Sequence, residues 1–76
     1  MATYLSQNAR RYEIDATPRM ADCQYVAHAQ IFTVGFEGGA REIHRSGDLA
    51  AFVERSQAVS FAEAWARRWL DDILSL

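Results

Sequence analysis

The longest regular pattern of apolar and polar positions in this chain runs over residues 56–74. Apolar residues recur there at spacings of three and four, which is the period of one helix face, and neither glycine nor proline interrupts them. The recurring apolar positions are Ala58, Val59, Ala62, Trp65, Ala66, Trp69, Leu70, Ile73 and Leu74. This pattern predicts a long C-terminal helix whose apolar stripe, including both tryptophans, is buried against a sheet.

Three earlier segments have the pattern of β-strands. In residues 12–17 apolar and polar side chains alternate, which is typical of a strand with one buried face. Residues 24–35 predict a longer strand with apolar residues on both faces, and residues 40–45 predict a short third strand. Residues 1–9 have no such period, so we expect a flexible N-terminus there.

The segments between these strands have the composition of turns and connectors. Pro18 has no amide hydrogen to donate, so we expect it to end the first strand, and residues 19–22 are interpreted as a loop. The paired glycines Gly38 and Gly39 predict a hairpin turn after the second strand. Residues 49–52 predict an apolar connector, with a helical turn, that leads to the C-terminal helix.

The length of the glycine turn decides which face of the sheet Ile43 joins. A three-residue loop over residues 37–39 places Ile43 on the buried face, opposite Thr33, and leaves His44 in solvent. A two-residue loop places Ile43 on the other face, opposite Val34. We favour the three-residue loop because it buries Ile43.

Together these segments predict an α+β fold, a three-stranded antiparallel meander with one long C-terminal helix packed on one face (β-β-β-α). Residues 10–76 then form a single domain. Ala27 and Ala29 leave room for the bulky tryptophans, so we place the odd-numbered face of the second strand under the helix. The other face of the sheet is then open to solvent or to a partner.

Length and composition fit a small single domain. The chain has 76 residues, half of them hydrophobic, and its single cysteine excludes an intramolecular disulfide. No apolar run reaches the roughly 20 residues of a membrane span or has the form of a signal peptide, so we expect a cytoplasmic protein without a membrane partner. The formal charge of −2 disfavours non-specific binding to nucleic acid.

Side chains with candidate catalytic or metal-binding chemistry are few. Cys23, His28 and His44 are the only soft or imidazole ligands, and they lack the short paired spacing of zinc sites. Cys23 and His28 are about 16 Å apart along an extended strand, which is too far for a nucleophile and its base. We therefore expect no enzymatic activity, no metal and no cofactor.

Two predicted surface features favour binding instead of catalysis. The first is an outward row on the open sheet face, formed by Val26, His28, Phe32, Val34 and His44. The second is a basic edge at the strand ends, formed by Arg10, Arg11, Arg41 and Arg45. The first predicts a non-catalytic interaction module that uses the open face or a strand edge to bind an unknown protein partner or to form a weak homodimer. The second predicts, as the alternative, an accessory transcription regulator that contacts nucleic acid.

The chain also carries a resemblance to known proteins over residues 12–71. Gly47, Phe52 and Ala58, followed by the run Ala66-Arg67-Arg68-Trp69-Leu70-Asp71, resemble the ending of short uncharacterised proteobacterial β-β-β-α proteins. The chain is more distantly similar to HlyU-type small regulators, which share a tyrosine-rich first strand and a similar helix end. Arg11 stands where such proteins often carry a glycine before the tyrosine. The resemblance implies the fold and assigns no functional residue.

Overall fold

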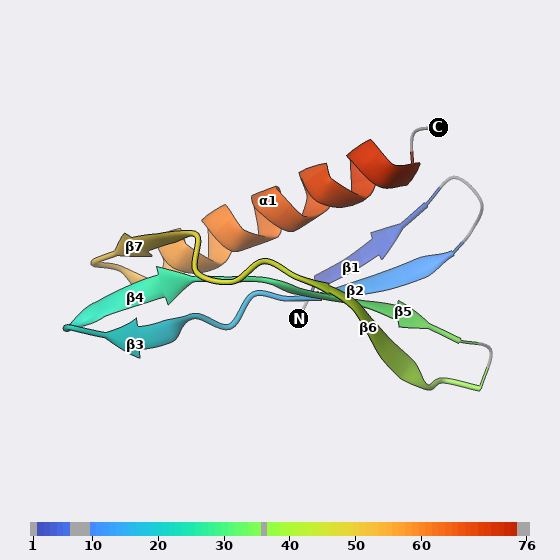
Figure 1. Cartoon of the computed structure of the whole chain (residues 1–76), viewed down its shortest axis with the longest axis horizontal. Helices are drawn as coiled ribbons and strands as arrows, with labels where there is room; N and C mark the ends of the chain where they lie inside the picture. Colours follow the sequence, from blue (N-terminus) through green and yellow to red (C-terminus); the bar gives the residue numbers. More distant parts are fainter. Residues whose placement is uncertain (1, 7–9, 36, 75–76) are drawn as a thin grey trace.

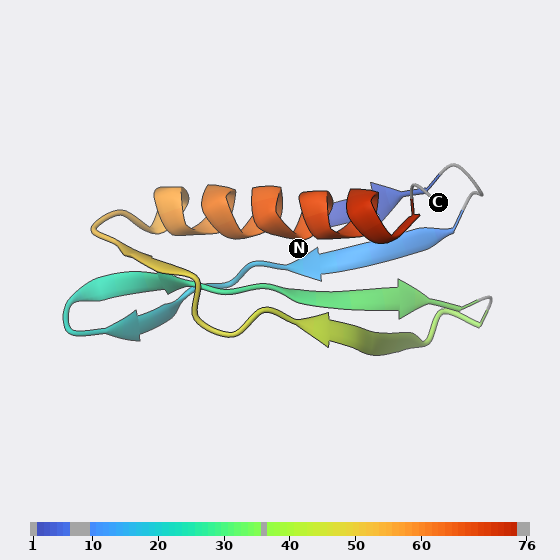
Figure 2. The same ribbon diagram turned by 45° about the horizontal axis from the view of Figure 1, so that its top comes forward.

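The computed structural model describes residues 2–6, 10–35 and 37–74, and it consists of a layer of antiparallel strands with one long helix across one side (Figures 1 and 2). The elements are β1 (Ala2–Leu5), β2 (Arg11–Asp15), β3 (Arg19–Ala21), β4 (Gln24–Ala27), β5 (Gln30–Val34), β6 (Ala40–Arg45), β7 (Ala50–Phe52) and α1 (Arg55–Leu74). The α+β class and the C-terminal helix are confirmed. The three-stranded meander is wrong, because the strands form two sheets, with the orders β1-β2-β5-β6 and β3-β4-β7.

The strands form two sheets because two extended segments, residues 11–21 and residues 24–34, are each interrupted once. β2 and β3 are separated by the segment that contains Pro18, which cannot donate a ladder hydrogen bond. β4 and β5 are separated at His28 and Ala29, and the Ala29 N–H donates to the Ser46 hydroxyl at 2.8 Å instead of to a strand. The Ser46 N–H in turn donates to the Ala29 carbonyl at 2.9 Å, so the segment around Ala29 stays beside the segment that follows β6.

Strand β1 and the β3–β4 turn were not expected from the pattern. Ala2–Leu5 pair along β2, whereas residues 1 and 7–9 of the expected flexible segment lie outside the described residues. Asp22 and Cys23 have φ values of 51° and 61°, and they connect β3 to β4 in a two-residue hairpin. Two-residue hairpin turns with positive φ at both residues usually carry Asn-Gly or Asp-Gly. The Asp-Cys pair therefore did not indicate a hairpin, and the residues of β3 were interpreted as a loop.

The β5–β6 hairpin has neither of the two expected registers. Val34 pairs with Ala40, so residues 35–39 connect the strands, and Gly38 takes a φ of 80°. Further along, Phe32 pairs with Glu42 but Ile31 pairs with His44, which makes Ile43 the extra residue of a β-bulge. The expected burial of Ile43 is therefore wrong: its side chain is 39% exposed, and His44 takes the place on the helix side.

Small side chains allow α1 to pack closely on the sheets. Its buried residues follow a spacing of four and are Ala58, Ala62, Ala66 and Leu70, each 0% exposed. Ala27 and Ala29, on the predicted odd-numbered face of the second strand, are equally buried in the same cluster. Trp65 and Trp69 lie at the flank of this stripe and are only partly buried, because alanines and not tryptophans occupy the line of closest approach.

Candidate interaction surfaces

The side of the four-stranded sheet that faces away from α1 is the open face. Ala2, Tyr4, Tyr12 and Ile14 pack into the helix-side core, so the alternate residues along the same strands point the other way. We call the apolar members of this opposite side the open-face patch. Its members are Leu5, Phe32, Val34 and Ala40. Leu5 is 70% exposed, which makes it one of the most accessible large apolar side chains described.

The structure brings together only part of the row expected on this face. Phe32 and Val34 lie next to each other in β5 and are partly buried. Val26 is in the other sheet, where it pairs with Arg19 and Ala51 and is 9% exposed. His28 lies at the interruption between β4 and β5.

His44 is not on the open face at all, because the bulge at Ile43 places it opposite Ile31 on the helix side. Leu5 was not expected in this patch, because residues 1–9 carry no period that signals a strand. The direct pairing of β1 with β2 is what places Leu5 on the open face.

A contact to the helix holds β1 in this position. The Tyr4 hydroxyl donates a hydrogen bond to the Asp71 carboxylate near the end of α1. This hydrogen bond is the main reason that the pKa of Tyr4 is raised above its ordinary value, since losing the phenol proton would remove the donor. Tyr4 also packs edge-on against Tyr12, with ring centroids 6.3 Å apart. β1 is thus held to the helix from one side while Leu5 is presented on the other.

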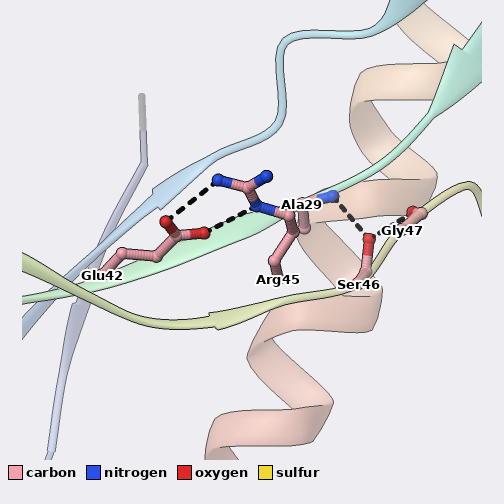
Figure 3. A network of polar contacts seen from close by, with 5 residues as sticks. All are labelled: Ala29, Glu42, Arg45, Ser46 and Gly47. Carbon is pink, nitrogen blue, oxygen red and sulfur yellow. Dashed lines mark hydrogen bonds and ion pairs between the residues drawn. The ribbon is translucent and has the colours of Figure 1, made fainter.

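Charged residues around the open-face patch are largely paired with one another. Arg11 contacts Glu13 at 3.3 Å within β2. Arg45 donates two hydrogen bonds to Glu42, at 2.9 and 3.1 Å, and Figure 3 shows this pair beside the Ser46 bridge. The hydrogen bonds from Arg45 lower the pKa of Glu42, and the same contact raises the pKa of Arg45.

The four arginines expected at a basic edge lie in separate places. Arg10 and Arg11 are at the start of β2, which is an inner strand because β1 covers its free side. Arg41 and Arg45 are near opposite ends of the edge strand β6, and the register with Thr33 and Gln30 puts them on opposite faces. These positions do not form one continuous arginine edge.

The edge strands of both sheets are poorly suited to pairing with a strand of another chain. β3 and β7 have three residues each and β1 has four. β6 has six, but the bulge at Ile43 interrupts its regular spacing of hydrogen-bonding groups. Short and bulged edge strands are a common way in which proteins avoid pairing with other chains. The open face is therefore a better candidate than the edges.

On the helix side, His44 lies flat against both tryptophans. The imidazole and Trp69 ring centroids are 4.2 Å apart with an interplanar angle of 4°, and the values for Trp65 are 5.7 Å and 12°. Parallel, closely spaced rings of this kind stabilise each other beyond the apolar area that they bury. Residues on β6 and α1 that are far apart in sequence thus fix one another's orientation.

Two shallow hollows have linings that include both polar and apolar residues. One lies between β2 and α1 and is lined by Ala2, Ile14, Ala16, Thr17, Arg55, Val59 and Glu63. The other lies at the sheet junction and is lined by Arg19, His28, Gln30, Arg45, Gly47 and Asp48, with Arg19 paired to Asp48 at 2.6 Å. Cys23 is exposed at the β3–β4 turn, away from both hollows. Within residues 2–6, 10–35 and 37–74, no three His, Cys, Asp or Glu side chains are grouped as metal ligands.

A local hydrogen-bond pair near the first hollow leads to a pH-dependent prediction. Asp15 accepts hydrogen bonds from the Thr17 hydroxyl at 2.7 Å and the Thr17 N–H at 3.0 Å, and these lower the pKa of Asp15. The pKa of a free Asp in the unfolded chain is about 3.9, and the pKa of Asp15 in the folded chain is lower. The ionised carboxylate therefore stabilises the fold at pH values above about 3.9, and this stabilisation is lost as the pH falls through the pKa of the folded state. Thr17→Val is therefore expected to cost about 1 kcal/mol at pH 7 and much less at about pH 2.

Urea unfolding at a series of pH values, followed by tryptophan fluorescence, measures this difference. Thr3→Val is the matched control, because it makes the same chemical change on the neighbouring strand β1. A constant gap between Thr17→Val and the wild type from neutral to acidic pH would contradict the role given to Asp15.

No protein-family model, no curated protein and no solved structure matches this chain. The resemblance to proteobacterial β-β-β-α proteins and to HlyU-type regulators therefore stays a prediction from the sequence. Among the described residues, α1 is the one helix, and it is not apolar enough to cross a membrane.

Proposed function

We propose that this chain is a small non-catalytic protein-interaction module, and that its open face binds a second copy of the chain as a weak homodimer. The observation that carries the proposal is the open-face patch, in which Leu5 is 70% exposed while the core residues on the helix side are buried. Apolar side chains gathered on an uncovered sheet face are a common form of protein-binding surface.

The distribution of charge across the open face favours a second copy as the partner. The outward residues of β2 are all charged, namely Arg11, Glu13 and Asp15. The outward residues of the neighbouring β5 are all uncharged, namely Gln30, Phe32 and Val34. A two-fold axis parallel to the strands, between β2 and β5, lays β2 of one copy over β5 of the other. No like charges then face each other, and the aliphatic stem of Arg11 covers Val34 of the second copy.

The same charges limit the strength of the dimer. Packing two such faces removes water from Arg11, Glu13 and Asp15, and the Arg11–Glu13 ion pair offsets only part of that cost. We therefore expect dimers at high protein concentration and monomers on dilution. Electrostatic pairing on this face is partly exposed, so added salt changes the affinity only modestly.

Phe32→Ser is expected to raise the dissociation constant of the dimer by about tenfold or more, because it removes the central ring of the patch. The fold should be retained, with a loss of about 1 kcal/mol, since Phe32 is only partly buried and lies away from the core under α1. Sedimentation equilibrium over a concentration series measures the association, and urea unfolding measures the stability.

Phe61→Ser is the matched control, because it makes the same change at a 43% exposed position on the helix. A wild-type chain that stays monomeric at every concentration would overturn the proposed dimer. Equal association of Phe32→Ser and the wild type would overturn the assignment of the open face.

A further inference from the structure

Strand β1 belongs to the open face but contributes no residue to the buried core. Ala2 and Tyr4 pack against the core cluster from outside, and both are only partly buried. The two side chains that point the other way, Thr3 and Leu5, are exposed. β1 can therefore leave the sheet without removing any buried residue from the core.

Two sets of contacts hold β1 in place. One is its pairing with β2 over four residues, which the Ser6 N–H extends by donating to the Arg10 carbonyl at 3.0 Å. The other is the hydrogen bond from the Tyr4 hydroxyl to the Asp71 carboxylate, which we call the latch. Among the described residues, it is the only hydrogen bond that a side chain of β1 makes. The latch thus joins the first strand to the end of α1, on the side of the sheet opposite the open face.

Release of β1 would change the open face in two ways. Leu5, which is 70% exposed, would leave the open-face patch. β2 would become the edge strand of the four-stranded sheet, and its N–H and C=O groups on that side would lose their partners. The surface assigned to the dimer is therefore complete only while β1 is paired.

We propose that β1 alternates between a paired and a released state, and that the latch sets the balance between them and so regulates the open-face dimer. This regulation rests on the proposed function. Short terminal segments outside the core open with free energies close to zero, which gives the released state an appreciable population. Both copies must have β1 paired, so the apparent dissociation constant rises with the inverse square of the paired fraction. A change at the end of α1 thereby alters a contact on the opposite side of the molecule.

Amide hydrogen exchange on the dilute monomer tests the latch by itself. Tyr4→Phe removes the donor and keeps the ring that packs against Tyr12. We expect the amides of β1 to exchange about two- to fivefold faster in this variant, and those of β5 to be unchanged. Asp71→Ala should have the same effect, and the double variant no more than either single one, because all three lack the same hydrogen bond. Asp71→Asn keeps an oxygen acceptor and should stay close to the wild type.

Tyr25→Phe is the matched control for the loss of a tyrosine hydroxyl. Tyr25 is also partly buried against the core, but it lies on β4 in the other sheet. We expect this variant to leave the exchange of the β1 amides unchanged.

Sedimentation equilibrium then tests the regulation. If about one copy in five is released in the wild type, a fivefold shift lowers the paired fraction from about 0.8 to about 0.44 and raises the dissociation constant about threefold. We expect this rise in Tyr4→Phe and in Asp71→Ala, although neither residue lies on the open face. Because coupling is reciprocal, the β1 amides of the wild type should also exchange more slowly as its concentration increases. Leu5→Ser should remove that dependence on concentration.

The two measurements fail in distinguishable ways. Unchanged exchange of the β1 amides in Tyr4→Phe would overturn the latch, whatever the state of the dimer. Faster exchange with an unchanged dissociation constant would overturn the regulation and leave the dimer in place. A wild type that is monomeric at every concentration would overturn the dimer and its regulation together, and the exchange rates would still decide whether the latch holds β1.

Discussion

Ala62→Leu is expected to lower the free energy of unfolding by about 3 kcal/mol, one of the two largest effects that a single substitution should have in this chain. Ala62 is 0% exposed at the centre of the stripe where α1 packs on the sheets, and the nearby Ala27 and Ala29 are equally buried. A leucine there has no free volume to occupy, so the helix must move away from the sheet or the side chain must take a strained rotamer. Urea unfolding followed by tryptophan fluorescence measures the loss.

Ala64→Leu is the matched control, since it makes the same change on the exposed side of the same helix. We expect it to alter stability by less than about 0.5 kcal/mol. If Ala62→Leu were as stable as Ala64→Leu, the close approach of helix and sheet along the alanine stripe would be wrong.

Leu70→Ala is expected to cost about 2–5 kcal/mol, because it deletes one of the few large side chains that are completely buried. Leu70, Ile14 and Ile31 are the largest side chains with almost no exposure, and the rest of the buried helix stripe is alanine. A domain of this size has only about 5 kcal/mol of stability to lose. We therefore expect the variant to be partly unfolded at room temperature, as measured by circular dichroism and urea titration.

Leu74→Ala makes the identical change one turn further along α1, where the leucine is 37% exposed. Its expected cost is less than about 1 kcal/mol. Similar losses for the two leucine variants would mean that Leu70 does not anchor the helix on the sheets.

Local pattern alone was enough to predict the C-terminal helix, the α+β class of the fold and the burial of Ala27, Ala29 and Ile31. The expected helix over residues 56–74 differs by one residue from α1, because a period of 3.6 sustained without glycine or proline has no competing interpretation. The burial of Ala27, Ala29 and Ile31 follows from alternation along a strand together with the need for small residues under a helix. These features depend on neighbours within a few residues.

The candidate sites depended on contacts that no local pattern contains. Leu5 joins the open-face patch only because β1 pairs with β2, and the pairing of β1 depends on residues about ten positions away and on Tyr4 reaching Asp71 in the helix. The expected grouping of Arg10 and Arg11 with Arg41 and Arg45 failed for the same reason, since β1 turned the expected edge strand into an inner one.

His44 is the clearest case of a position that only the tertiary structure decided. The sequence by itself determined that residues 40–45 form a strand and that a helix with two tryptophans covers one side of the sheet. It did not determine the bulge at Ile43, because a shift of one residue reverses the face of every later side chain while leaving the local pattern unchanged. Stacking of the imidazole on Trp65 and Trp69 becomes available only after β6 and α1 have packed together. That stacking favours the bulged register over the one that buries Ile43.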